Sequence, residues 1–178
     1  MKFNPDIHNR RSIRLKDYDY AKKGLYFITI VTQYRECLFG EVIDGHMKLN
    51  DSGHAVLSVW DDIPVHYPGA ELDTCVIMPN HLHGIVVLNV GAGPCARPGF
   101  LSLPDVMQRF KSMSTHRYKQ GVIEENWRVF PGRLWQRGYY ERIIRNNDEL
   151  QPIREYIHDN PRMWATDEEN PTIAGKGE

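Results

Sequence analysis

The pattern of hydrophobic and polar positions along the chain predicts strands and helices in alternation. Residues 25–33 (LYFITIVTQ) form a run of β-branched and aromatic residues that predicts a buried strand. Residues 41–50 predict two short strands joined at an Asp-Gly pair, because that dipeptide favours tight hairpin turns. A helix is expected next, capped by Asn50 or one of the two residues after it, with its apolar positions on one face.

The second half of the chain continues this alternation. Residues 71–90 predict two strands joined by a tight reversal, and the Gly/Pro-rich residues 91–99 predict a surface connection. An amphipathic helix is expected from Ser102. Residues 133–145 predict a strand flanked by turns, and a last helix is expected from Asn147 or Asp148 to Pro161.

The order of these elements is strand, helix, strand, strand, helix, strand, helix. It predicts an α+β fold of the ferredoxin-like split βαβ type, with an antiparallel sheet and helices packed on one face. We expect a basic extended arm over residues 1–20, one domain over residues 21–165 and an acidic flexible tail over residues 166–178.

Composition is typical of a soluble globular protein, with 41% hydrophobic and 25% charged residues in 178. No apolar run approaches the roughly 20 residues that a membrane helix needs, so we expect no membrane association. The first residues lack the apolar stretch of a secretory signal, and the three cysteines form no CxxC pair. We therefore expect a cytoplasmic protein without a structural zinc cluster.

Charge is unevenly distributed along the chain. The net charge is −1, but residues 97–154 contain eleven Lys and Arg against six Asp and Glu. A local basic excess is compatible with a face that binds a polyanion, and equally with an ordinary solvated surface.

Two histidines lie two residues apart at the start of a predicted strand. Residues i and i+2 of a strand point to the same side, so His81 and His83 project together while Leu82 faces the core. Paired imidazoles can form half of a metal site. Alternatively, one histidine caps a turn and the other lies on the sheet surface.

A tyrosine and an asparagine share one face of the last predicted helix. Tyr156 and Asn160 are four residues apart, about one helical turn. A phenol and an amide oxygen so placed are compatible with a nucleophile and a further metal ligand. The other interpretation is a half-buried aromatic residue and a residue that only terminates the helix before Pro161.

Several segments together resemble a known family. MPNHLHGIV and WQRGYYERIIRNNDELQPIREYIHDNP are similar to motifs of the HUH superfamily of nucleases, and within it to the REP-associated tyrosine transposases. YFITIVTQYRECLFG and DVMQRFKSMST also resemble that family. The similarity covers about residues 20–165, with the motifs in the family's order.

The resemblance implies roles for four residues. His81 and His83 would bind a divalent cation, Mg²⁺ or Mn²⁺, with Asn160 as a third ligand where the insertion-sequence relatives carry Gln. Tyr156 would be the nucleophile. Tyr139 and Tyr140 are the other candidates for that role, but they fall in a predicted strand, where β-propensity explains them.

The resemblance also implies an activity, a substrate and partners. The enzyme would cleave and rejoin single-stranded DNA at hairpins of repetitive extragenic palindromes through a 5′-phosphotyrosine intermediate, and would be a monomer. From charge and aromatic character, we expect DNA contacts from basic residues that hold phosphates and aromatic residues that stack on bases. These are Lys111, Arg133, Arg137, Arg142, Arg145, Trp135, Tyr139 and Tyr140.

Three alternatives remain open from the sequence. The protein could bind DNA hairpins without catalysis, or could be a metal-dependent phosphohydrolase that uses HxH and a water nucleophile. It could also be a structural ferredoxin-like module in which the histidines are incidental. Tyr156→Phe separates the tyrosine-nucleophile enzyme from the hydrolase. It should abolish cleavage by the former and leave the hydrolase nearly unaffected, since a water nucleophile does not need the phenol.

Overall fold

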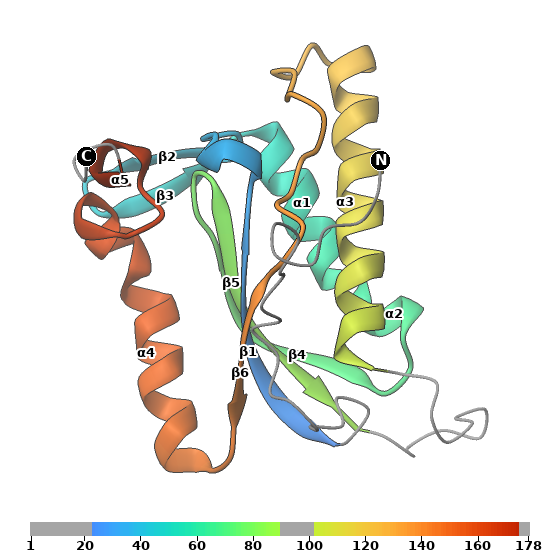
Figure 1. Cartoon of the computed structure of the whole chain (residues 1–178), viewed down its shortest axis with the longest axis vertical. Coiled ribbons are helices and arrows are strands. Elements are labelled where there is room, and N and C mark those ends of the chain that lie inside the picture. The colour runs from blue at the N-terminus through green and yellow to red at the C-terminus, as the bar shows by residue number, and fades with distance from the viewer. Residues whose placement is uncertain (1–22, 90–101, 175–178) are drawn as a thin grey trace, which may run out of the picture.

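The computed structural model describes residues 23–89 and 102–174, which are built around a four-stranded antiparallel sheet in the order β4-β5-β1-β6 (Figure 1). The sheet strands are β1 (Gly24–Val31), β4 (Ala70–Ile77), β5 (His81–Leu88) and β6 (Tyr140–Ile144). A separate hairpin is formed by β2 (Gly40–Ile43) and β3 (His46–Leu49). The helices are α1 (Asp51–Asp61), α2 (Ile63–His66), α3 (Leu103–Glu124), α4 (Asn147–Met163) and α5 (Pro171–Ala174), with 3-10 turns at Gln33–Arg35 and Trp164–Thr166.

The connectivity confirms the ferredoxin-like α+β class. Helix α1 connects β1 to β4 and helix α3 connects β5 to β6, while each of these strand pairs is separated in the sheet by one antiparallel strand. This is the split βαβ arrangement. Figure 1 shows α1 and α3 on one side of the sheet and α4 on the other.

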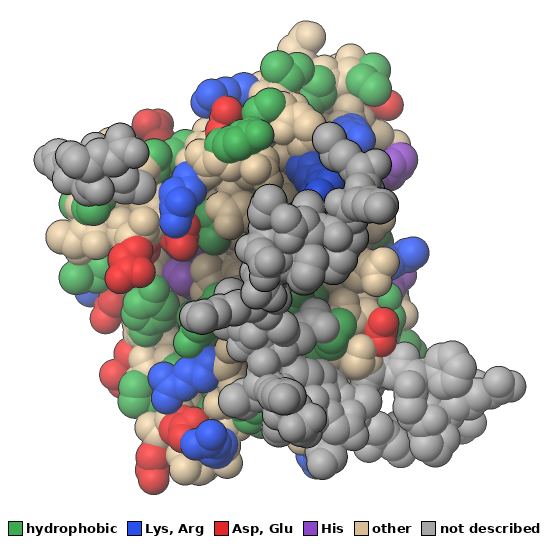
Figure 2. All heavy atoms as spheres, viewed as in Figure 1, with side chains coloured by type: hydrophobic (Ala, Val, Ile, Leu, Met, Phe, Trp, Pro, Cys, Tyr) green, Lys and Arg blue, Asp and Glu red, His purple; other side chains and the backbone are tan. Residues whose placement is uncertain are grey.

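Surface charge is mixed on the face shown in Figure 2. Lys and Arg side chains are interspersed there with Asp and Glu, and the described residues visible in that view form no continuous basic strip. Any DNA contact by these residues would therefore be local rather than spread over a uniformly positive face.

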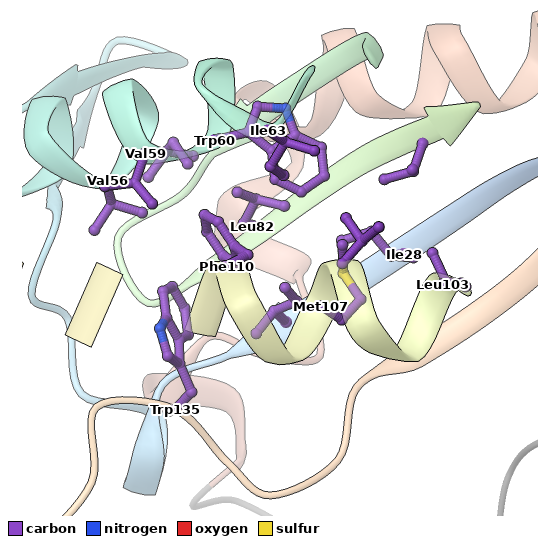
Figure 3. Packing of buried hydrophobic residues seen from close by; sticks show 14 of the residues in the cluster. Ile28, Val56, Val59, Trp60, Ile63, Leu82, Leu103, Met107, Phe110 and Trp135 are labelled. Atoms are coloured by element: carbon purple, nitrogen blue, oxygen red, sulfur yellow. The ribbon is translucent and has the colours of Figure 1, made fainter. Parts of the chain in front are cut away.

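The larger hydrophobic core lies between the sheet and helices α1 and α3. Alternate residues of the two central strands, such as Ile28 and Leu82, point into it and meet Trp60 of α1 and Phe110 of α3 (Figure 3). The rings of Trp60 and Phe110 meet edge to face, with centroids 5.4 Å apart. The central strands are therefore fixed from this side by the two crossover helices.

The second face of the sheet is also apolar, and α4 covers it. The cluster there comprises Phe27, Ile85, Ile144, Leu150, Ile153 and Ile157. Our expectation of helices on one face holds for α1 and α3 but not for α4. The physical reason is that β1 and β5 have apolar side chains on both sides, and the hydrophobic face of α4 buries the second one.

Local expectations in the first half of the chain are confirmed. The hairpin turns at Asp44 and Gly45, both with positive φ, as a two-residue turn requires. The side chain of Asn50 accepts from the Gly53 amide at the start of α1. Residues 70–88 form the two strands expected there, joined at Met78–Asn80.

The second half differs from expectation at two places. The strand expected over residues 133–145 is confined to β6, and the chain before it makes only an isolated bridge between Thr32 and Trp135. Helix α4 continues past Pro161 to Met163. The proline removes only one backbone donor, and the last turn still closes through a hydrogen bond from the Trp164 amide to the Pro161 carbonyl. The expected arm over residues 1–20 and the connection at 91–99 lie outside the described residues.

Among the helices that the structure describes, none combines the length and apolar character needed to span a bilayer.

Candidate active site

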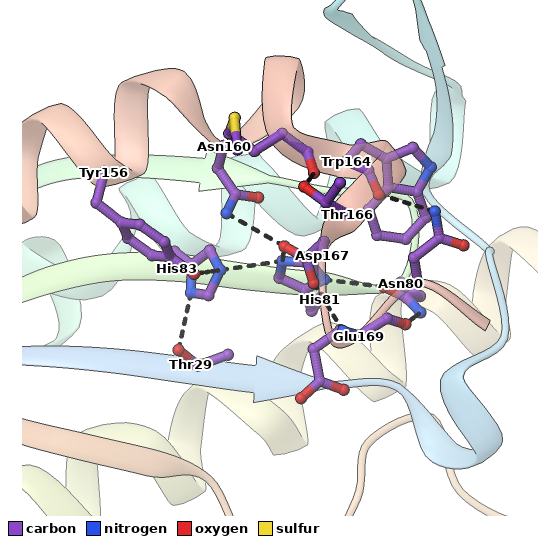
Figure 4. Close-up of polar contacts among 12 residues, drawn as sticks. Thr29, Asn80, His81, His83, Tyr156, Asn160, Trp164, Thr166, Asp167 and Glu169 are labelled. Carbon is purple, nitrogen blue, oxygen red and sulfur yellow. Dashed lines mark hydrogen bonds and ion pairs between the residues drawn. The ribbon is translucent and has the colours of Figure 1, made fainter. Parts of the chain in front are cut away.

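A buried pair of histidines lies on the central strand β5. His81 is 0% exposed and His83 is 4% exposed, and they pair with Val31 and Thr29 of β1. Because side chains alternate along a strand, both rings project to the α4 side while Leu82 enters the larger core. Their Nε2 atoms are 3.1 Å apart (Figure 4).

Asn80 orients the first of these rings. Its Nδ2 donates to the carbonyls of Arg35 and Glu169, at 3.0 and 2.7 Å, so its Oδ1 is the atom that faces His81. The Nδ1 of His81 donates to that oxygen at 2.9 Å. A proton on Nδ1 leaves the Nε2 lone pair of His81 free to bind a cation.

Both imidazoles are held in the neutral form. Burial lowers the pKa of His81 to about 4, although the carboxylate of Asp167 and the side chain of Asn160 oppose this shift. Burial and then the neighbouring His81 lower the pKa of His83 well below its usual value. The Nδ1 of His83 is 2.8 Å from the Thr29 hydroxyl, which can orient this ring as Asn80 orients the first. Neutral imidazole is the form that binds metals.

Helix α4 presents Tyr156 to the histidines. Its hydroxyl is 3.3 Å from the Nε2 of His83, and its ring meets Phe27 edge to face. Tyr156 is 49% exposed, so substrate can reach the phenol. Burial of its inner side and then the carboxylates of Asp167 and Glu168 raise the pKa of Tyr156, which is therefore a protonated phenol at neutral pH.

Asn160 lies one turn further along α4 and is 2% exposed. Its Nδ2 donates to Asp167 Oδ2 at 3.3 Å, whereas its buried Oδ1 has no partner among the described residues. A buried carbonyl oxygen without a donor is unusual, and an amide oxygen is a suitable ligand for a hard divalent cation. The donor set therefore fits the divalent metal that the family resemblance implies.

Asp167 belongs to the stretch that we expected to be a loose tail. Its side chain is 7% exposed, and its Oδ2 is 3.9 Å from the Nε2 of His81. Ligand atoms of His81, His83 and Asp167 all lie within 4.8 Å of one another. The sequence offered no positional signal for this residue, because an acid in a polar segment after a helix has no periodicity that indicates its direction.

The site opens into a cavity of about 540 Å³. Tyr156, His83, Asn160 and Tyr140 line it, with Thr29 and the acidic residues 167–169 on other sides. Tyr140 pairs with Thr29 on the neighbouring strand and is 47% exposed. The cavity is thus bordered by the phenol and by a second exposed aromatic ring.

All four arginines expected to contact DNA are exposed. Arg142 belongs to β6, and Arg145 immediately follows that strand. Arg133 and Arg137 line a second cavity of about 530 Å³ together with Tyr34, which is 70% exposed and was missed in the sequence. An exposed tyrosine beside two arginines has the chemistry of a site for an unpaired base and its phosphate.

Three other residues that we expected to contact DNA make their contacts within the protein instead. Lys111 donates to the carbonyls of residues 136–138, and burial lowers its pKa to about 8. Trp135 is 4% exposed and donates to Ser114, with its ring against Phe39 and Phe110. A base-stacking role for Trp135 conflicts with this burial. The Tyr139 ring lies beneath the Lys111 amine, 5.4 Å from it, and packs against the larger core.

The described residues thus combine a ferredoxin-like sheet, a neutral histidine pair on its central strand and a half-exposed tyrosine on the helix that covers it. Comparison with known proteins is consistent with this class of site. The chain belongs to the IS200-like transposase family, whose family model matches residues 22–160.

Two curated proteins and one solved structure are also similar to this chain. A Haemophilus influenzae protein of uncharacterized function is 43% identical over 175 residues, covering 94% of this chain and 96% of its own. Another protein of that organism, provisionally named a REP-associated tyrosine transposase, is 28% identical over 150 residues, covering 80% and 73%. A structure of a REP-associated tyrosine transposase bound to a REP hairpin shares the fold, with a TM-score of 0.54 and 21% identity over 83% of this chain and 72% of that one.

Proposed function

We propose that this protein cleaves and rejoins single-stranded DNA in a divalent-metal-dependent reaction, with Tyr156 as the nucleophile. One observation carries the proposal: the Tyr156 hydroxyl is 3.3 Å from His83 Nε2, which is itself 3.1 Å from His81 Nε2. Tyr156 and His83, which are 73 residues apart in the chain, therefore line one cavity, and His81 contacts His83 from its buried position.

Three side chains would hold the cation in this proposal. They are His81 and His83 through Nε2, and Asn160 through its unpaired Oδ1. The bound cation, Mg²⁺ or Mn²⁺, would neutralise charge on a non-bridging phosphate oxygen and polarise phosphorus. The protein would keep both imidazoles neutral by burying them, and would orient them through Asn80 and Thr29.

The chemical step is a transesterification. The Tyr156 oxygen forms a bond to phosphorus while the bond to the 3′ oxygen of the preceding nucleotide breaks. The phenol proton is lost, the leaving oxygen gains a proton, and the products are a 5′-phosphotyrosine ester and a free 3′-OH. A 3′-OH can attack that ester in the reverse sense, so rejoining needs no ATP.

Hairpin DNA is the proposed substrate. The support comes from the family, from the REP-associated relative and from the structural neighbour that is bound to a REP hairpin. The exposed residues Arg133, Arg137, Arg142 and Arg145 would hold phosphates, and Tyr140 and Tyr34 would stack on unpaired bases. We further propose that the protein acts as a monomer in the cytoplasm.

The deciding experiment uses single-stranded hairpin oligonucleotides labelled at the 5′ or the 3′ end, with MnCl₂, on denaturing gels. Wild type is expected to carry the 3′-labelled fragment covalently, and Tyr156→Phe is expected to form no adduct. Tyr140→Phe is the matched control, because it removes a second hydroxyl from the same cavity but keeps the aromatic ring that would stack on a base. It should still form the adduct.

Other outcomes would replace the proposal. Metal-dependent cutting by Tyr156→Phe without an adduct would mean a hydrolase with a water nucleophile. Tight hairpin binding with no cutting by any variant would mean a binding protein without catalysis.

A further inference from the structure

Residues 167–170 follow α4 and lie against the histidine strand, where two side chains hold them. Asn80 donates to the Glu169 carbonyl at 2.7 Å, and Arg35 pairs with the Glu169 carboxylate at 2.8 Å. Asn80 is also the residue that orients His81. One buried amide therefore fixes both the first histidine and the segment that carries Asp167, so their relative position is built into the structure (Figure 4).

The two carboxylate oxygens of Asp167 have different surroundings. Oδ1 accepts from the Glu169 amide at 2.7 Å and closes a tight turn. Oδ2 faces the site, where it accepts a long bond of 3.3 Å from Asn160 Nδ2 and lies 3.9 Å from His81 Nε2. The turn thus sets the rotation of the side chain and directs one oxygen toward the imidazole pair.

This nearly buried carboxylate lacks a cationic partner within the described residues. Its side chain is 7% exposed, and no described Lys or Arg forms an ion pair with it. The His81 Nε2 lies 3.9 Å from its Oδ2, but this ring is neutral at neutral pH and supplies no positive charge. Removing a carboxylate from water is costly unless a positive charge compensates it. A divalent cation between Asp167 and the histidines would supply that charge, and a carboxylate oxygen is the ligand that Mg²⁺ and Mn²⁺ prefer.

We infer that Asp167 is an anionic ligand of the cation, in addition to His81, His83 and Asn160. The inference rests on the proposed function, because it assumes a cation at the histidine pair. The 3.1 Å between the two histidine nitrogens suits neighbouring ligands at about 2.1 Å from one ion. The ligand set is then two imidazoles, one amide oxygen and one carboxylate, which reduces the charge of the ion–ligand unit to +1.

The test measures binding of Mn²⁺ alone to the full chain, by titration calorimetry or by the EPR signal of free Mn²⁺. Asp167→Asn keeps an Oδ1 for the turn and removes the charge, so the fold should persist, as a thermal melt without metal would verify. We expect its Kd for Mn²⁺ to rise by at least about tenfold, the loss found even for residues that only support a metal ligand. Asp167→Glu, which keeps the charge, should bind more tightly than Asp167→Asn.

Two further variants make the result specific. Glu168→Gln removes the neighbouring, exposed carboxylate of the same cavity and should change the Kd by less than about twofold, since exposed charges are screened. An equal loss in Glu168→Gln and Asp167→Asn would reduce the effect to general electrostatics and overturn the inference. Unchanged binding by Asp167→Asn, with binding lost in His81→Ala, would also overturn it but would leave the proposed function intact. Wild-type binding by both Asp167→Asn and His81→Ala would refute the metal site itself.

Discussion

An ion pair between Asp73 and Arg154 ties the helix that carries Tyr156 to the edge strand β4. Arg154 donates through Nε to Asp73 Oδ1 at 2.9 Å and through a terminal nitrogen to Oδ2 at 2.6 Å. This two-point contact is the main reason why the pKa of Asp73 is lowered from 3.8 to about 2, and the Thr74 amide adds to the effect. We predict that Asp73→Asn destabilises the protein, because it removes the charge while keeping an acceptor for Thr74.

The magnitude follows from that pKa. The difference between 3.8 and about 2 corresponds to about 2 kcal/mol of stability at neutral pH if fully expressed. The Asp73 and Arg154 side chains are 19% and 40% exposed, so solvent screening reduces the expected loss to about 1 kcal/mol. In a domain of this size that is a decrease in Tm of roughly 2–4 °C.

The pH dependence has a definite sign. A carboxyl whose folded pKa is depressed contributes stability above its unfolded pKa and loses it as pH falls through the folded value. The difference in unfolding free energy between wild type and Asp73→Asn should therefore be complete above about pH 5, about half gone near pH 3 and absent below about pH 1. Urea unfolding at several pH values measures it.

A matched control is Asp159→Asn, which removes an exposed carboxylate from the same helix. Its effect should stay within about 0.5 kcal/mol, as for most surface substitutions. If the difference in unfolding free energy between wild type and Asp73→Asn does not shrink with falling pH, the electrostatic reasoning is refuted. An equal loss of unfolding free energy in Asp159→Asn would refute it as well.

Three further substitutions test the packing on the two faces of the sheet and the hydrogen bonds of the segment before β6. Gly84→Ala would place a Cβ 2.5 Å from the Trp60 ring, so we expect a loss of about 1–3 kcal/mol in urea unfolding, and a loss below 0.5 kcal/mol would mean that the ring moves freely. Ile157→Ala empties a fully buried position under α4 and should cost about 2–5 kcal/mol, whereas Ile157→Val should cost about 1 kcal/mol. Lys111→Met removes the donor to three carbonyls, so amide exchange over residues 136–138 should accelerate relative to α1, and unchanged exchange would contradict this role.

Local features of the site could be derived from the sequence because they depend on residues close together in the chain. The spacing of His81 and His83 places both rings on one side of a strand, and the spacing of Tyr156 and Asn160 places both on one side of a helix. Strand and helix starts follow in the same way from β-branched runs and capping residues such as Asn50.

Contacts between distant segments were decided only by the tertiary structure. Trp135 has an aromatic side chain of the kind that stacks on bases, yet it is buried in the core with residues of α1, α3 and the sheet. Asp167 reaches the histidines because Asn80, 89 residues before Glu169, binds the segment that contains both acids. Periodicity predicts which face of a helix or strand is buried. Which other element packs against that face depends on shape complementarity and on the need of each buried polar group for a hydrogen bond.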